Sequence, residues 1–196
     1  GPHLQGLRDG IRRGDRRGQG VATILGQIAA HRLGVPYETV RVQLGDSDFH
    51  ILARSTAGSR QTAFSGNAVL RAVDDLLEQG SHSEDQNENI DGLELIRRVR
   101  ASGQPMIGRG LFESHPTFPA RSNKGDQIYF GYGFFSNVAI VRADDVTGEV
   151  RVESLHSCYD VGRAINRCAI EGQLEGGAMM GIGFALSEEY STSETY

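Results

Sequence analysis

Five glycines interrupt the stretch from Ile170 to Glu189, which otherwise has the pattern of one long helix: Gly172, Gly176, Gly177, Gly181 and Gly183. Each glycine inside a helix costs about 1 kcal/mol relative to alanine. So many glycines are tolerated where another backbone or a ligand presses against the helix. The segment therefore predicts a closely packed helix, with Phe184, Ala185 and Leu186 entering the core.

Other glycines gather in loops next to predicted helices. Gly18-Gln19-Gly20 and the segment from Gly58 to Thr62 each precede a helical period, and a third loop runs from Asp160 to Asn166, with Gln173 in the glycine-rich segment that follows. Unpaired N–H groups at a helix start bind anions such as phosphate. For each loop alone, an ordinary capped turn remains the alternative.

Together the three loops predict one extended ligand that has a phosphate and several hydrogen-bonding edges. The second loop offers two hydroxyls, an amide and a guanidinium, a donor set that suits a phosphate or a polar heterocycle. The candidate ligand contacts are Gln19, Gly20, Gly58, Ser59, Arg60, Gln61, Thr62, Asp160, Asn166 and Gln173.

The hydropathy pattern predicts an α+β chain. Helical periods cover residues 21–33, 66–78, 92–100 and 170–189, and strand patterns cover residues 38–44, 106–112, 127–135, 136–143 and 148–155. Residues 1–17 are basic, with no apolar period, and a disordered terminus is their simplest interpretation. The domain is then residues 18–196, with sub-lobes over residues 18–103 and 104–196.

The composition argues against several classes of protein. The formal charge is −5, which disfavours a dedicated nucleic-acid binder; only the arginines before residue 18 would favour one. No apolar run is long enough for a membrane span or a secretory signal, so neither is expected. Cys158 and Cys168 fit no standard zinc spacing and indicate a reduced, cytoplasmic location. Nucleophile-elbow, P-loop and His-Glu-x-x-His motifs are absent from the sequence.

Three collinear segments resemble the molybdenum-cofactor-binding large subunit of the xanthine dehydrogenase and aldehyde oxidase family. They are GQGVATILGQIAAHRLGVPYETVRVQLGDSD, TAGSRQTAFSGNAVLRA and VTGEVRVESLHSCYDVGRAINRCAIEGQLEGGAMMGIGFALSEE. The resemblance implies a mixed sheet with helices, as in part of the molybdopterin-binding domain. It covers only a minor part of the family's subunit.

The resemblance also implies a cofactor, molybdopterin, which in bacteria is often extended to the cytosine dinucleotide. The family holds molybdenum through the pterin sulfurs, so no protein ligand to the metal is expected. Carried over, Gln19 with Gly20 lies near the metal and pterin, and Gly58 to Thr62 contact the pterin or its phosphate. Gln173 completes the pterin contacts, and Asp160 and Asn166 lie near the dinucleotide end.

The family oxidises heteroaromatic or aldehyde carbon with water-derived oxygen and passes electrons to 2Fe–2S and FAD centres on other domains or subunits. Its catalytic base is a glutamate beyond the last helix, and this sequence ends at Tyr196 before reaching it; Glu188 and Glu189 are not that residue. Arg167 stands where the family pattern has proline, and the charged residues 7–17 replace a strand.

We therefore expect part of a molybdopterin-dependent oxidoreductase that is inactive by itself and has no catalytic residue of its own. Its partners would be the remaining segments of the molybdenum subunit, the iron–sulfur and FAD subunits, and a small-molecule substrate. The alternative is a non-catalytic, split cofactor-binding or assembly subunit that a partner chain completes. Both hypotheses predict the same cofactor-binding loops.

Overall fold

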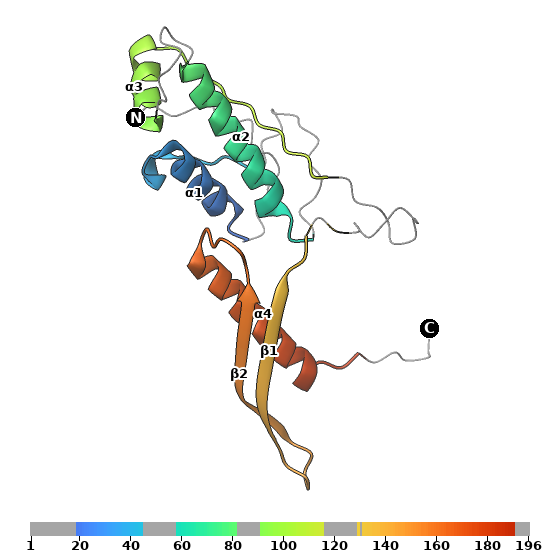
Figure 1. Ribbon diagram of the computed structural model, residues 1–196. Helices are drawn as coiled ribbons and strands as arrows, with labels where there is room; N and C mark the ends of the chain where they lie inside the picture. The colour runs from blue at the N-terminus through green and yellow to red at the C-terminus, as the bar shows by residue number, and fades with distance from the viewer. Residues whose placement is uncertain (1–18, 45–57, 82–90, 116–128, 130, 191–196) are drawn as a thin grey trace, which may run out of the picture. The chain divides into compact units, whose positions relative to one another are not determined.

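The computed structural model describes residues 19–44, 58–81, 91–115, 129 and 131–190. The chain divides into two compact units, residues 1–116 (unit 1) and 117–196 (unit 2). The elements in chain order are α1 (Val21–Leu33), the short 3₁₀ helix η2 (Tyr37–Thr39), α2 (Gln61–Ser81), α3 (Gly92–Ser102), β1 (Phe134–Ala143), β2 (Val150–Asp160) and α4 (Arg167–Leu186) (Figure 1). The α+β class is confirmed.

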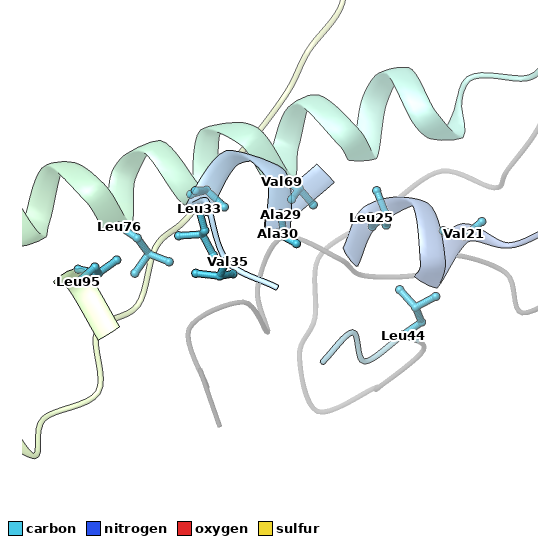
Figure 2. Close-up of a cluster of buried hydrophobic side chains, with 11 residues drawn as sticks. Val21, Leu25, Ala29, Ala30, Leu33, Val35, Leu44, Val69, Leu76 and Leu95 are labelled. Atoms are coloured by element: carbon cyan, nitrogen blue, oxygen red, sulfur yellow. The ribbon is translucent and has the colours of Figure 1, made fainter. Parts of the chain in front are cut away.

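The core of unit 1 lies between three helices. Apolar residues three and four apart on α1 and α2 face one another, and α3 adds Leu95, as Figure 2 shows. The buried cluster consists of Val21, Leu25, Ala29, Ala30, Leu33, Val35, Leu44, Val69, Val73, Leu76 and Leu95. The helical periods predicted over residues 21–33 and 92–100 are therefore confirmed by their buried faces.

Helices α1 and α2 run in the same direction. A Cβ on Gly66 would lie 2.9 Å from Ile28 Cδ1, and further along both helices Arg32 Nη2 lies 2.6 Å from Asp74 Oδ1. Because later residues of one helix meet later residues of the other, the two N-termini lie at the same end of unit 1 (Figure 1).

The segment after α3 was predicted to be a strand over residues 106–112, and that prediction is wrong. The segment lies along α2 and bonds to its side chains instead of to a neighbouring strand. The pairs are Arg109 N–H with Asp75 Oδ2 (2.7 Å), Gln79 Nε2–H with Ile107 O (3.1 Å), and Arg71 Nη1–H with Leu111 O. Gly108 and Gly110 permit this approach, because a Cβ on either would overlap the α2 backbone.

Other predicted boundaries also change. The strand predicted over residues 38–44 is η2 followed by an extended segment that forms no ladder with the described residues. The helix predicted from residue 66 begins at Gln61, and the helix predicted from residue 170 begins at Arg167 and ends at Leu186. Of the strand predicted over 127–135, residues 134 and 135 belong to β1, while residues 127, 128 and 130 lie outside the described residues.

Unit 2 contains an antiparallel hairpin, as predicted for residues 136–155. The register runs from Phe134 opposite Asp160 to Ala143 opposite Val150. At the turn, Asp144 Oδ1 accepts from the N–H groups of Val146 (2.9 Å) and Thr147 (2.8 Å). These two bonds hold the pKa of Asp144 below its usual value. Among the described residues, the expected mixed sheet consists of this antiparallel pair of strands.

Helix α4 packs against β2 along one stripe of its surface. Its half-buried apolar residues, Ile170, Leu174, Ala178 and Ile182, recur every four positions and form that stripe. The prediction that Phe184 and Leu186 enter the core is wrong, because their side chains are 75% and 46% exposed. Close packing at the helix glycines is also not found among the described residues: a Cβ on Gly172, Gly176, Gly177 or Gly181 would meet none of their atoms within 4 Å.

Leu95 and Leu93 form a matched pair for testing the unit 1 core. Leu95 is 2% exposed and Leu93, on the same helix, is 47% exposed. We expect Leu95→Ala to lower the free energy of unfolding by about 3 kcal/mol, because it leaves a cavity, and Leu93→Ala to lower it by about 0.5 kcal/mol. Urea denaturation of the full chain measures both; equal effects would contradict the assigned core.

Asp75 should make the stability of unit 1 depend on pH. The N–H of Arg109 and the side-chain amide of Gln79 hold the pKa of Asp75 below its model-compound value of 3.8. Because folding lowers this pKa, the ionised carboxylate stabilises the fold at pH values above its unfolded-state pKa. This stabilisation is lost as the pH falls through its folded-state pKa. Because solvent screens this carboxylate, we expect it to contribute about 1 kcal/mol or less to the free energy of unfolding. Denaturation experiments should show that the free energy of unfolding falls less between pH 7 and pH 3 for Asp75→Asn than for the unchanged chain.

Candidate functional site

The N-terminus of α1 is open to an anion. Gly20 is the N-cap, with φ of 72°, and no side chain caps the helix there. Gln19 and Gly20 are exposed, and the first turn of α1 contains no acidic residue. The first N–H groups of a helix have no acceptor within the helix, and they carry a partial positive charge. Gln19 can add a side-chain amide donor at this position.

The N-terminus of α2 follows a turn in a conformation that is unusual for serine. Gly58 has φ of 62° and Ser59 has φ of 54°, so two consecutive residues adopt the left-handed region. The first bond of α2 joins Phe64 N–H to Arg60 O at 2.9 Å, which makes Arg60 the N-cap. Gln61 and Thr62 therefore belong to the first turn of the helix and not to the preceding loop.

The side chains of this turn are positioned by neighbours on α2. The Arg60 guanidinium lies 5.9 Å from the centroid of the Phe64 ring, and Gln61 Nε2 donates to Ser65 Oγ at 2.7 Å. Sequence reasoning missed Phe64, although an aromatic residue four positions after a basic one on a helix is a recognisable pair. Gly58, Ser59 and Thr62 are exposed, so a ligand can reach them from solvent.

The two helix starts form one positive end of unit 1. Each N-terminus carries the equivalent of about half a positive charge, and parallel helices present both at the same end. No acidic residue occurs in the first turn of α1 or of α2. We call Gln19, Gly20 and the segment from Gly58 to Thr62 the two-helix cradle. Its donors and charge suit a phosphate attached to a polar heterocycle.

The third predicted loop has local structural roles in unit 2. Asp160 Oδ1 accepts from Gly162 N–H at 3.0 Å in the turn after β2, and Asn166 Oδ1 caps α4 by accepting from Ala169 N–H at 2.9 Å. Gln173 falls in the first turn of the helix predicted from residue 170, but α4 begins at Arg167, so Gln173 lies in its second turn and is exposed. That these three residues meet the two-helix cradle stays a prediction.

The described residues contain neither a metal-binding cluster nor a membrane-spanning helix. No group of three or more His, Cys, Asp or Glu side chains there could hold a metal ion. None of the helices in the described segments is long and apolar enough to cross a membrane.

The chain matches known cofactor-binding proteins over nearly all its length. Residues 13–195 match the family described as the molybdopterin cofactor-binding domain. The nicotine 6-hydroxylase large subunit of Paenarthrobacter nicotinovorans is 31% identical over 190 residues, covering 88% of this chain and 23% of that protein. The aldehyde oxidoreductase molybdenum-binding subunit of Escherichia coli is 32% identical over 182 residues, covering 90% of this chain and 24% of that protein.

Solved structures agree with this match. The aldehyde oxidoreductase from Desulfovibrio desulfuricans superposes with a TM-score of 0.68 at 26% identity, over 89% of this chain and 19% of that one. The α+β chain is thus of the class of proteins that bind a molybdopterin cofactor. The chain belongs to the molybdopterin cofactor-binding domain family, as part of a molybdenum-cofactor-binding subunit of the xanthine dehydrogenase type. It spans about a quarter or less of the relatives it matches.

Proposed function

We propose that this chain forms part of the cofactor site of a molybdenum hydroxylase that oxidises a heteroaromatic or aldehyde carbon with water-derived oxygen. The observation that carries the proposal is the parallel pair of helix N-termini, whose residues are those that the family resemblance assigns to the pterin. Nicotine and an aldehyde, in the names of the two relatives, are substrates of the proposed chemical classes.

In this proposal the cradle binds and orients the cofactor. N–H groups at the start of α2 donate to the phosphate, and the left-handed Gly58-Ser59 turn lets the backbone approach it closely. Gln19 donates its amide to the pterin side, and Gln173 adds a second amide. Asp160 and Asn166 would lie towards a cytosine dinucleotide extension. When bound, molybdopterin supplies the two-electron redox chemistry of the hydroxylation.

The 196 residues are proposed to need the rest of the enzyme for turnover. A hydroxylation of this kind needs a positioned general base, and no residue of the cradle is an acid or a histidine. We further propose 2Fe–2S and FAD centres on other domains or subunits as electron acceptors. A reduced, cytoplasmic location is supported by two cysteines, Cys158 and Cys168, that form no disulfide.

The test is the composition of the enzyme that contains this chain. We expect the complex purified from its source through a tag on this chain to contain about one molybdenum and one oxidised pterin per chain, and to oxidise heteroaromatic or aldehyde substrates. A complex with neither molybdenum nor pterin would contradict the proposal. A complex with cofactor but without turnover would favour the alternative, a cofactor-binding or assembly subunit.

The isolated chain provides a separate prediction. Reconstituted with molybdenum cofactor, the 196 residues should show no oxidation of purines or aldehydes above the rate of free cofactor, because no base is positioned. Spectrophotometric assay with an artificial electron acceptor measures this rate. Sustained turnover by the isolated, loaded chain would show that a base lies within it.

A further inference from the structure

Many large apolar side chains in the described part of unit 2 are exposed to solvent. All buried apolar residues of the described parts of the chain lie between Val21 and Leu95, in unit 1. In unit 2 the strands expose Phe134, Phe135 and Val138 by 71%, 68% and 58%. A two-stranded hairpin has marginal stability in water, and α4 packs on it along one stripe only. This unit therefore needs a further layer of structure to cover it.

The outer face of α4 shows where part of that layer would pack. Gly172, Gly176, Met180 and Phe184 recur every four residues and form one stripe, which we call the outer stripe. It is displaced by two residues, about 200° around the helix, from the stripe that packs on β2. Met180 and Phe184 are 74% and 75% exposed, and a Cβ on Gly172 or Gly176 would meet no atom of the described residues within 4 Å. The stripe can admit a closely packed apolar element.

The described part of unit 1 offers little apolar surface to cover this stripe. Its described residues include four large exposed apolar side chains, Tyr37, Leu93, Ile107 and Leu111, and the rest of its large apolar residues are at least partly buried. The cofactor is also a poor match, because a pterin phosphate is polar and charged, whereas Met180 and Phe184 are apolar. The matched relatives, by contrast, have most of their length outside the segment that this chain covers.

We propose that the outer stripe of α4 is the docking surface for an apolar element of the molybdenum-binding subunit that lies outside these 196 residues. This inference rests on the proposed function, since it takes its partner from the same subunit. The glycines at one end of the stripe allow backbone approach, and Met180 and Phe184 at the other end supply the apolar area. Burial of these two side chains offsets the helical cost of the glycines.

Site-specific photocrosslinking in the assembled enzyme tests the proposal. A benzophenone amino acid at position 180 should crosslink to a peptide of the molybdenum-binding subunit outside these residues, whereas the same probe at Val146, which is 89% exposed at the hairpin turn, should not. Crosslinks from position 180 to unit 1, to a second copy of the chain or to another subunit would overturn the proposal. Absence of any crosslink from position 180 would overturn it as well.

Charge substitutions give an independent measurement. We expect Met180→Glu to reduce recovery of the rest of the molybdenum-binding subunit with this chain by about tenfold or more, because it buries an unpaired charge, while Val146→Glu leaves recovery unchanged. Gly176→Ala should weaken recovery while keeping or raising the helicity of the isolated chain, which separates docking from folding. Unchanged recovery for Met180→Glu and Gly176→Ala would overturn the proposal. Molybdenum and pterin, measured on the unchanged complex, test the proposed function separately.

Discussion

We expect an enzyme with Gln61→Pro to bind molybdopterin about 10- to 100-fold more weakly while it keeps helix α2. Gln61 is the first residue of α2, a position where proline is favoured, and Arg60 before it is the N-cap, a position that is extended in most helices. The substitution removes one backbone donor from the cradle. A hydrogen bond to a charged group contributes roughly 1.5–3 kcal/mol, which corresponds to that loss of affinity.

Gln61→Ala is the matched control for this substitution. It also removes the side-chain bond from Gln61 to Ser65, but it keeps the backbone N–H. We expect it to retain molybdopterin to within a few-fold, as measured by pterin fluorescence after gel filtration, with the same far-UV circular dichroism as Gln61→Pro. Equal retention by both variants would mean that the α2 N–H group does not bind the cofactor.

Gly110→Val is expected to destabilise unit 1 by about 3 kcal/mol or more. A Cβ at this position would overlap Ala68 O and lie 2.5 Å from Ala72 N, both in the backbone of α2. A helix backbone cannot move aside as a side-chain end can, so the segment after α3 would have to leave α2. Its bonds to Asp75 and Arg71 would then be lost.

Gly131→Ala is the control for the glycine substitution, because no atom of the described segments lies within 4 Å of its added Cβ. We expect its thermal midpoint to stay within about 2 °C of the unchanged chain, and that of Gly110→Val to fall by more than about 10 °C. A Gly110→Val chain with an unchanged midpoint would show that the segment does not rest on α2 in solution.

Helix positions could be predicted from the sequence because their signals are local. The apolar period over residues 21–33 and the stop at Gly34 define α1, and Gly34 is its left-handed C-cap. The segment over residues 106–112 could not be predicted in this way. Its alternation of glycine and larger residues is typical of a strand, but its bonding partners lie on α2, more than 25 residues earlier in the chain. Local pattern contains no information on such a pairing.

The positions of the candidate loops next to helix starts could be predicted from the sequence, but the geometry of these loops could not. Glycines next to helix starts identified the loops, whereas the left-handed conformation of Ser59 and the shared direction of α1 and α2 arise from tertiary packing. Gln173 was misplaced by three residues, about one turn, relative to the start of α4, because the helix starts at Arg167 and not at residue 170. Asn166 then became the cap of that helix.

The structure of the holoenzyme, determined with molybdopterin bound, tests the central claim most directly. The measurement is the distance from the cofactor to the cradle and to Gln173. We expect polar atoms of Gln19, of the turn from Gly58 to Thr62 and of Gln173 all to lie within about 3.5 Å of one molybdopterin, with the phosphate at the start of α2. A cofactor that contacts neither helix N-terminus, or Gln173 on a surface remote from it, would contradict the account.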